Sequence, residues 1–463
     1  MLPEPVRRFI QWAADEALWG PLHLGGYRFP SVLAILLFGS GLYLTIRYRF
    51  VQLTRFREAA LTLIPPQAAG AKGALSPFQA FMTALAASIG TGNIAGVATA
   101  VVSGGPGAVF WIWCYGFFAT TIKFTEAVLG VRYRVLGAGR LSAGPMHYLR
   151  DGLKSPKLGW AYALIAGVAA LTTTPFTQPN SVAVVWQSEF GVSTWVTGVI
   201  VAVLTWLVII GGITAIGRAM EKLAPLKVFL YLAGGLVVIV THGHRIPEIL
   251  ALIFREAFSI GAVVGGTTGA GIMVAMRYGL ARGIYANEAG YGTAAVAYGT
   301  ARSEEPVQQG LNAVMEVFIV SCVTSSISAL TILLSGAWRS GLTSTAAVAS
   351  AFNSAMPTVG GWMVALCAFL FGYTTLIGWA YYGEQFLEHI MGPRVVLPYR
   401  WIYCGLIVLG AVSQVETVWA WGDLMNGLQI FPNMVGVLGL SGVAAAALRS
   451  WRESPRPAGE RAG

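Results

Sequence analysis

Residues 78–103 read FQAFMTALAASIGTGNIAGVATAVVS, and this stretch decides how the rest of the chain is interpreted. It is long and apolar enough to cross a bilayer, which takes about 20 residues of helix. Its middle, however, reads GTGNIAG, and each glycine costs about 1 kcal/mol relative to alanine inside a helix. The pattern therefore predicts a membrane helix that is interrupted near its centre.

The composition of the whole chain is that of a protein that crosses a membrane many times. Hydrophobic residues make up 56% and charged residues 11% of the 463 residues, whereas soluble domains contain about 45–50% and about 25%. The net charge of +10 is spread over short loops, without the basic and aromatic stripe of a nucleic acid binder. The composition therefore predicts an all-α polytopic membrane protein surrounded by lipid. It excludes secreted disulfide scaffolds, disordered chains and nucleic acid binders.

Eleven apolar stretches are long enough to be membrane helices. They cover residues 30–48, 78–103, 106–131, 158–186, 193–213, 222–241, 256–280, 308–336, 345–383, 401–415 and 427–448. The ninth is too long for one straight span, so we expect it to include a membrane-flanking helix around residues 347–356. With the N-terminus outside, 22 of the 30 Lys and Arg residues fall in cytoplasmic segments and 6 in outside segments. Because positive loops stay in the cytoplasm, we expect an inner-membrane protein with its N-terminus outside and its C-terminus inside.

A second glycine-rich segment, GGTTGAG, occupies residues 265–271 of the seventh predicted span. Each of the two glycine segments opens a block of five spans, and because five is odd the blocks start at opposite faces of the membrane. Paired interrupted spans in an inverted repeat indicate a transporter with a site near the middle of the membrane. The expected organisation is an N-terminal segment with one extra helix, two five-helix repeats and a basic tail, at residues 1–77, 78–241, 256–448 and 449–463.

An interrupted membrane helix has a simple chemistry. The unwound backbone presents N–H groups at one half-helix end, which suit a carboxylate, and carbonyl oxygens at the other, which suit a cation. The alternative is that Gly92 and Gly96 only allow two helices to pack closely. That alternative is weakened by the polar residues Thr91 and Asn93 beside them and by the second glycine segment.

Four stretches of the chain carry a family resemblance. They are FQAFMTALAASIGTGNIAGVATA (78–100), GPGAVFW (105–111), ARGIYANEAGYGTA (281–294) and TTLIGWAYYGE (374–384). Together they resemble the alanine/glycine:cation symporter family of the amino acid, polyamine and organocation superfamily, in unbroken order from about residue 30 to 448. The resemblance implies one N-terminal helix and a 5+5 inverted repeat with two discontinuous helices, the LeuT-like fold. It also implies import of small neutral amino acids, chiefly alanine and glycine, usually with sodium.

The resemblance further implies which residues bind the amino acid. These are Gly90, Thr91, Gly92, Asn93, Gln178, Gly266, Gly269, Thr375 and Trp379. Thr91 and Asn93 would take the carboxylate of the substrate, Gln178 would offer its side-chain amide, and Trp379 would limit the size of the side chain. The alternatives are an interhelical hydrogen bond for Gln178 and a packing or interface role for Trp379.

A sodium site is implied in the same way, built from the oxygen atoms that hard cations prefer. It would use the backbone near Ala87 and Gly90 together with the hydroxyls of Thr374 and Thr375. The eighth span departs from the family pattern, because it reads EVFIVS from Glu316 where family members commonly have GVFIDT. Glu316 stands one helical turn before the missing acid and either compensates for it in cation coupling or faces the cytoplasm.

Lys227 on the sixth span is a second departure, since the family usually has an apolar residue there. In some sodium-independent or proton-coupled members of the wider superfamily, a lysine on the equivalent helix takes the place of the cation. An ammonium group buried away from water readily gives up its proton, so Lys227 could carry a proton instead of sodium. The alternative is that Lys227 snorkels to the cytoplasmic interface near Lys222.

Two further pairs of polar residues match family motifs. Lys123 and Glu126 lie three residues apart on the third span, and we expect them to form a structural ion pair. Asn287 and Glu288 are expected in a cytoplasmic loop after the seventh span, with a structural or gating role rather than substrate contact.

The sequence thus predicts a secondary transporter that moves a small neutral amino acid inward with a cation by alternating access. A channel would line its pore with rings of like residues and needs no paired interrupted helices. An enzyme would need a nucleophile with a base or a metal-ligating cluster, yet the five histidines lie outside the spans or at their edges. We therefore expect no enzymatic activity.

Overall fold

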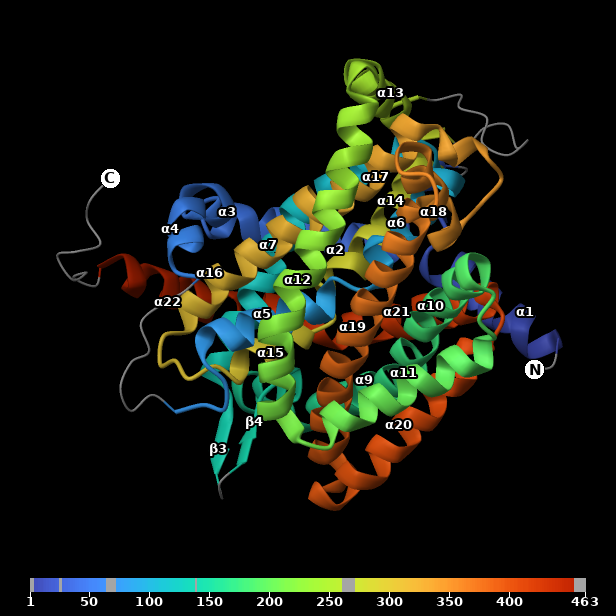
Figure 1. Cartoon of the computed structure of the whole chain (residues 1–463). Helices are drawn as coiled ribbons and strands as arrows, with labels where there is room; N and C mark the ends of the chain where they lie inside the picture. Colours follow the sequence, from blue (N-terminus) through green and yellow to red (C-terminus); the bar gives the residue numbers. More distant parts are fainter. Residues whose placement is uncertain (1–3, 25–26, 64–71, 138–139, 260–270, 454–463) are drawn as a thin grey trace.

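The computed structural model describes residues 4–24, 27–63, 72–137, 140–259 and 271–453, and these residues are mostly helical (Figure 1). The helices of the first half are α1 (Glu4–Trp12), α2 (Val32–Arg47), α3 (Val51–Thr54), α4 (Phe56–Leu61), α5 (Pro77–Ser88), α6 (Ala95–Gly104), α7 (Ala108–Arg132), α8 (Pro145–His147), α9 (Pro156–Thr172), α10 (Thr174–Phe190), α11 (Thr194–Ile209) and α12 (Gly212–Thr241). Those of the second half are α13 (Ile246–Ala257), α14 (Gly271–Asn287), α15 (Thr293–Gly299), α16 (Pro306–Val317), α17 (Ser325–Ser335), α18 (Ser344–Ala355), α19 (Val359–Met391), α20 (Val396–Ala411), α21 (Val415–Gly439) and α22 (Ser441–Glu453).

Short π and 3-10 turns and two small hairpins complete the fold. The π turns are η1 (Ala13–Leu18), η3 (Tyr148–Gly152) and η5 (Phe318–Thr324), and the 3-10 turns are η2 (Thr91–Asn93), η4 (Gly243–Arg245), η6 (Ala337–Arg339) and η7 (Pro393–Val395). Strand β1 (Leu22–Leu24) pairs antiparallel with β2 (Tyr27–Phe29), and β3 (Val135–Gly137) with β4 (Arg140–Ser142). The β3–β4 hairpin and helix α13 lie at opposite ends of the molecule (Figure 1).

Five helical segments of the described residues are long and apolar enough to cross a membrane, or seven if each of two bent pairs is one span. The five are Pro156–Phe190, Gly212–Thr241, Pro306–Ser335, Val359–Met391 and Pro393–Ala411. This confirms the all-α membrane class, whereas the count of eleven spans and the four-part division of the chain stay predictions. Helix α18 forms before α19, where the membrane-flanking helix was expected.

The last predicted span, 427–448, begins too late, and it includes a bend of 50° between α21 and α22, which together are apolar enough for one bent span. Helix α21 begins at Val415. Its N-terminal half carries polar residues such as Asn426, which lower the hydropathy, but Asn426 is buried inside the protein. A polar residue that is satisfied inside a bundle therefore hides part of a helix from a hydropathy search.

The interruption predicted at residues 90–96 is confirmed. Helix α5 starts at a capping box of Ser76 and Gln79, and a bend of 57° separates it from the helical residues Thr91–Gly104. The two glycines at the bend cannot be replaced by larger residues without a shift of their neighbours. A Cβ on Gly90 would lie 2.7 Å from Thr375 Oγ1, and one on Gly92 would lie 2.5 Å from Tyr285 Cδ1.

The second interruption that the structure describes lies at residues 288–292, between α14 and α15. Glu288, Gly290 and Gly292 all have left-handed backbone conformations, with φ of 57°, 94° and 85°. Asn287 and Glu288 are buried at this break, so the prediction that they lie in a cytoplasmic loop is wrong. Of the predicted interruption at residues 265–271, all but the last residue lies outside the described residues, and Gly266 and Gly269 are among those outside.

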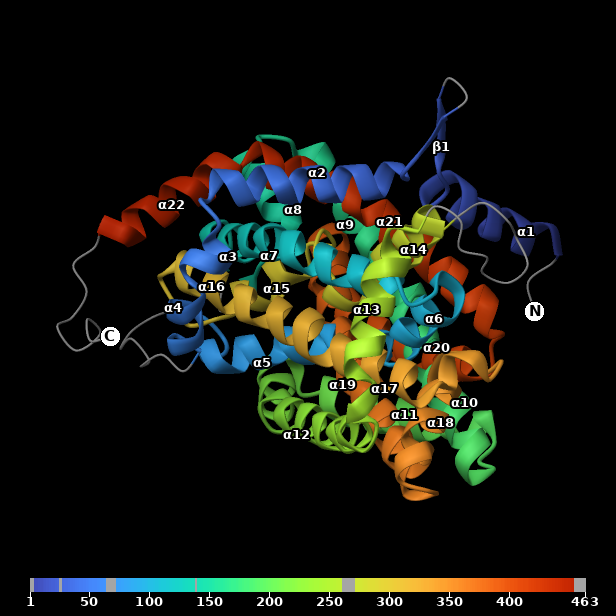
Figure 2. The ribbon, with the colours of Figure 1, turned by 90° about the horizontal axis from the view of Figure 1, so that it is seen from above.

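The two broken helices pack side by side and run in opposite directions. Helix α6, which follows the first break, contacts α14, which precedes the second, and α5 contacts α15. This antiparallel pairing is the arrangement that an inverted repeat produces. Figure 2 shows α2 and α22 along one side of the molecule and α12 along the opposite side, with the broken helices between them. The unwound backbone is thus enclosed by protein, where its polar groups can be satisfied.

Candidate functional site

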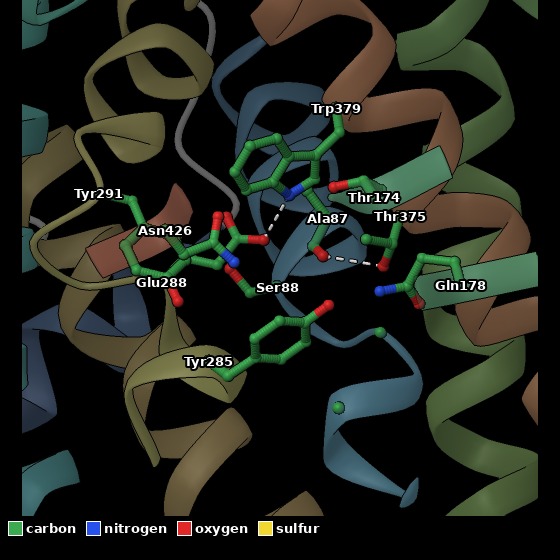
Figure 3. A pocket seen from close by; sticks show the side chains of 12 residues that line it. Ala87, Ser88, Thr174, Gln178, Tyr285, Glu288, Tyr291, Thr375, Trp379 and Asn426 are labelled. Carbon is green, nitrogen blue, oxygen red and sulfur yellow. Dashed lines mark hydrogen bonds between the residues drawn. The ribbon is translucent and has the colours of Figure 1, made fainter. Parts of the chain in front are cut away.

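A small pocket lies where the two breaks meet (Figure 3). Its lining residues are Ala87, Ser88, Gly90 and Gly92 from the first break, Tyr285, Glu288 and Tyr291 around the second, Thr174 and Gln178 from α10, Thr375 and Trp379 from α19, and Asn426 from α21. The free space is about 10 Å³, which is room for about one water molecule. The pocket is therefore a small space among buried residues, lined by both polar and apolar groups.

Gln178 is held at the pocket by the first break. Its Oε1 accepts hydrogen bonds from the backbone N–H and from the hydroxyl of Thr91, both at 2.9 Å. A backbone N–H can only donate, so the amide oxygen must face Thr91 and the amide nitrogen is left to point into the pocket (Figure 3). Thr91 itself does not line the pocket, and its role is to orient Gln178.

Thr375 and Trp379 form the wall that α19 contributes, one helical turn apart. The Thr375 hydroxyl donates to the Ala87 carbonyl at 2.8 Å. The indole Nε1 of Trp379 donates to Glu288 Oε1 at 2.6 Å, and the side chain is buried. Trp379 therefore lines the pocket and is not an anchor at the membrane interface.

Glu288 and Tyr285 are pocket residues that the sequence reasoning did not assign to the substrate. Glu288 sits in the second break and accepts from Trp379 through Oε1 and from the Thr293 hydroxyl through Oε2 at 2.9 Å. The ring of Tyr285 packs against Gly92, and its hydroxyl donates to Thr177 Oγ1 at 2.7 Å. The acid beside glycines in NEAG (287–290) is a signal for Glu288, but the stronger glycine segment at 265–271 predicts the break earlier and leaves NEAG in a loop.

Asn93 does not line the pocket, so the prediction that its side chain faces the substrate does not fit the structure. Its Nδ2 donates to the Ser88 carbonyl at 3.0 Å, and its Oδ1 accepts from the Ser325 hydroxyl at 3.2 Å. Unwinding leaves backbone groups without helical partners. The Asn93 amide satisfies one of them and ties the break to α17.

Lys227 lies beside the first break and is fully buried, so the alternative that it snorkels to the interface is wrong. Its ammonium donates to the carbonyls of Ala86 at 2.8 Å and Ile89 at 2.6 Å and to Thr374 Oγ1 at 2.5 Å. The acceptors are carbonyl oxygens at the end of α5 and a hydroxyl oxygen of α19, the kinds of oxygen from which the sodium site was predicted. The Ala87 carbonyl accepts from Thr375 instead, and the Gly90 carbonyl accepts from the Asn93 N–H.

A second buried lysine lies on the other side of the break. Lys123 pairs with Glu316, with 2.5 Å between Nζ and Oε1, and also donates to Ser88 Oγ at 2.8 Å and to the Asn287 carbonyl at 2.6 Å. Tyr298 donates to Glu316 Oε2 at 2.9 Å. Glu316 is therefore neither exposed nor facing the cytoplasm, and it joins the two broken helices through Lys123.

The expected pairing of Lys123 with Glu126 is wrong. Glu126 Oε1 instead accepts from the backbone N–H groups of Gly290 at 3.0 Å and Gly292 at 3.1 Å and from Asn433 Nδ2 at 2.7 Å. A side chain on α7 thus caps the N–H groups that the second break exposes. The i, i+3 spacing identified two residues on one face but not the partners that the tertiary structure brings to each of them.

The pocket brings polar groups of both breaks to one small space. Both breaks contribute to the pocket, so a ligand there would contact residues of the two breaks together with the ends of α5 and α14 that lead into them. The described residues contain no group of three or more His, Cys, Asp or Glu residues that could hold a metal ion. The groups that the pocket offers to a ligand are hydrogen-bonding side chains and the Glu288 carboxylate.

Comparison with known proteins identifies the family. Residues 23–461 match the model of the sodium:alanine symporter family. An uncharacterized transporter of Haemophilus influenzae is 38% identical over 92% of this chain and 92% of its own. The sodium/alanine symporter AgcS of Methanococcus maripaludis is 37% identical over 95% of this chain and 96% of its own.

Solved structures agree on the fold. The crystal structure of MhsT in complex with L-phenylalanine has a TM-score of 0.58 at 12% identity and covers 82% of this chain and 99% of that chain. The Eremococcus coleocola manganese transporter has a TM-score of 0.53 at 15% identity and covers 79% and 77%. These transporters have the LeuT-type fold, which confirms the fold that was expected here. The protein is thus a multi-pass membrane protein and belongs to the sodium:alanine symporter family, whose members are secondary amino acid transporters rather than enzymes.

Proposed function

We propose that this chain imports a small neutral amino acid, alanine or glycine, across the inner membrane by alternating access. The observation that carries the proposal is the pocket where the two breaks meet. Gln178 and Glu288 offer a hydrogen-bond donor and a carboxylate there, while Trp379 and Tyr285 are bulky neighbours. The little free space favours a substrate with a small side chain, because a large one would have to displace these rings.

We propose in addition that Lys227 does the work of the coupled cation beside the first break. The family name and the Methanococcus relative make sodium the general expectation. In this chain, however, the ammonium of Lys227 already satisfies the Ala86 and Ile89 carbonyls and the Thr374 hydroxyl. A sodium ion at the same place would bring a second positive charge within a few ångströms of the first, which is strongly unfavourable in a buried site.

The experiment is uptake of radiolabelled alanine into proteoliposomes in which sodium and proton gradients are imposed separately. We expect uptake to continue when choline replaces sodium and to increase when the proton gradient is directed inward. A protonophore and empty liposomes are the controls. Uptake that requires sodium at every pH would contradict the role of Lys227, and the absence of alanine and glycine uptake under all gradients would contradict the proposed substrate.

The direction of transport rests on the proposed topology, in which the loop after α12 is outside and the loop before α9 is cytoplasmic. In a variant whose four native cysteines are replaced by serine, His244→Cys and Lys157→Cys each place one thiol in an exposed position. A membrane-impermeant maleimide added to intact cells is expected to label the first and to label the second only after permeabilisation. The reverse pattern would invert the topology.

A further inference from the structure

Glu288 is a buried carboxylate that makes no salt bridge with a described lysine or arginine. Its exposed fraction is 5%. The buried lysines Lys123 and Lys227 act on its charge from a distance, but both are bonded to other groups. The other buried acids that the structure describes are compensated differently: Glu316 pairs with Lys123 and Glu384 with Arg400, while Glu126 accepts three hydrogen bonds and does not line the pocket. A charged group away from water is costly unless it is paired, so the position calls for a positive group from a ligand.

The Glu288 carboxylate also has capacity to spare and a fixed orientation. Trp379 Nε1 donates to one oxygen at 2.6 Å and the Thr293 hydroxyl to the other at 2.9 Å. A carboxylate has about four acceptor positions, so each oxygen can accept another hydrogen bond. The two bonds hold the side chain at the pocket, where it can meet a ligand without first reorganising.

The opposite side of the pocket carries the complementary group. Figure 3 shows Gln178 facing Glu288 across the space, with its amide nitrogen directed inward and with Trp379 and Tyr285 between the two sides. A negatively charged hydrogen-bond acceptor, the Glu288 carboxylate, lies on one side, and an N–H donor, the Gln178 amide, lies on the other. These two groups match the ammonium and the carboxylate of a zwitterion. An α-amino acid has its ammonium and its carboxylate on one carbon and so fits between them.

We therefore propose that Glu288 binds the α-ammonium group of the substrate, which rests on the proposed function of amino acid transport. The substrate then needs a free primary ammonium beside its carboxylate. A ligand without a positive charge would leave the buried carboxylate uncompensated, which is unfavourable. Lactate, which has a hydroxyl in place of the ammonium of alanine, should be excluded.

The test compares the purified wild-type protein with Glu288→Gln and with the control Glu189→Gln, which makes the same change in a half-buried residue away from the pocket. Glutamine can still accept from Trp379 and donate to Thr293, so the local hydrogen bonds survive while the charge is lost. Binding of radiolabelled alanine, and its competition by lactate, are measured for each protein. We expect Glu288→Gln to raise the Kd for alanine about 10- to 100-fold and to narrow the preference for alanine over lactate, with no change in the control.

The outcomes test two claims separately: that Glu288 binds the substrate ammonium, and that the protein binds an amino acid at all. Alanine binding by Glu288→Gln that equals the wild type would overturn the assignment of the ammonium to Glu288. Parallel loss of affinity for every ligand, with the alanine to lactate preference unchanged, would also overturn it, because it would indicate a structural role. If Glu288→Gln cannot be purified, the preference for alanine over lactate is measured for Glu288→Asp instead. This variant keeps the negative charge and is expected to keep the preference. A wild-type protein that binds no amino acid would instead refute the proposed function.

Discussion

Replacement of Lys227 by methionine is expected to abolish amino acid uptake without preventing insertion of the protein into the membrane. Methionine has a similar length but donates no hydrogen bond, so the carbonyls of Ala86 and Ile89 and the Thr374 hydroxyl lose their shared donor. The Ala86 carbonyl still accepts from the Thr374 and Thr375 hydroxyls, whereas the Ile89 carbonyl loses its lysine donor. A buried polar group left unsatisfied costs about 1–3 kcal/mol, and every 1.4 kcal/mol is about tenfold in an equilibrium. We expect alanine uptake in proteoliposomes to fall by about 100-fold or more, because the arrangement of the break that binds substrate depends on this donor.

The control for Lys227 lies on the same helix. Lys222 is exposed on α12, five residues before Lys227, and Lys222→Met makes the identical chemical change without touching the break. It should transport as the wild type does. Uptake by Lys227→Met at the wild-type rate in choline would mean that the ammonium is dispensable. Uptake by this variant in sodium but not in choline would instead show that the oxygens can take up an ion once the lysine is gone.

The first broken helix could be predicted from sequence, whereas the second could not be placed. In both glycine segments, a high glycine content shows where helix is costly, and at residues 90–96 that signal was sufficient. The break at residues 288–292 has glycines only at 290 and 292, and its first residue, Glu288, adopts a left-handed conformation that non-glycine residues rarely take. Such a conformation is held by tertiary contacts, here the bonds of Glu288 to Trp379 and Thr293, which no local pattern reveals.

The pocket residues divide in the same way. Gln178, Thr375 and Trp379, implied by the family resemblance, do lie at the pocket. Asn93 lies beside it in sequence, but its amide serves the backbone of the break rather than the cavity. Closeness in sequence to an interruption therefore predicts that a residue lies near the pocket. Whether its side chain faces the pocket depends on which polar group of the unwound backbone needs a partner.

The partners of the buried charges were the least predictable feature, and they lead to the second large effect. Lys123 and Glu316 are 193 residues apart, fully buried, and joined at 2.5 Å. Breaking such a pair by removing one partner costs about 3–5 kcal/mol, because the other charge stays buried and uncompensated. We expect Glu316→Gln and Lys123→Met each to lower the thermal unfolding temperature of the detergent-solubilised protein strongly, whereas Asp151→Asn, which breaks an exposed pair with Arg150, should change it little.

A double-mutant cycle distinguishes this pair from the one that the spacing suggested. If Lys123 is compensated by Glu316, the double variant Lys123→Met/Glu316→Gln leaves no uncompensated charge and should be more stable than the sum of the two single losses predicts. The cycle of Lys123 with Glu126 should show a much smaller coupling, because Glu126 is satisfied by Gly290, Gly292 and Asn433 rather than by the lysine. A larger coupling to Glu126 would mean that the two broken helices are not joined through Glu316. Equal additivity in both cycles would mean that Lys123 acts through the Ser88 hydroxyl and the Asn287 carbonyl alone.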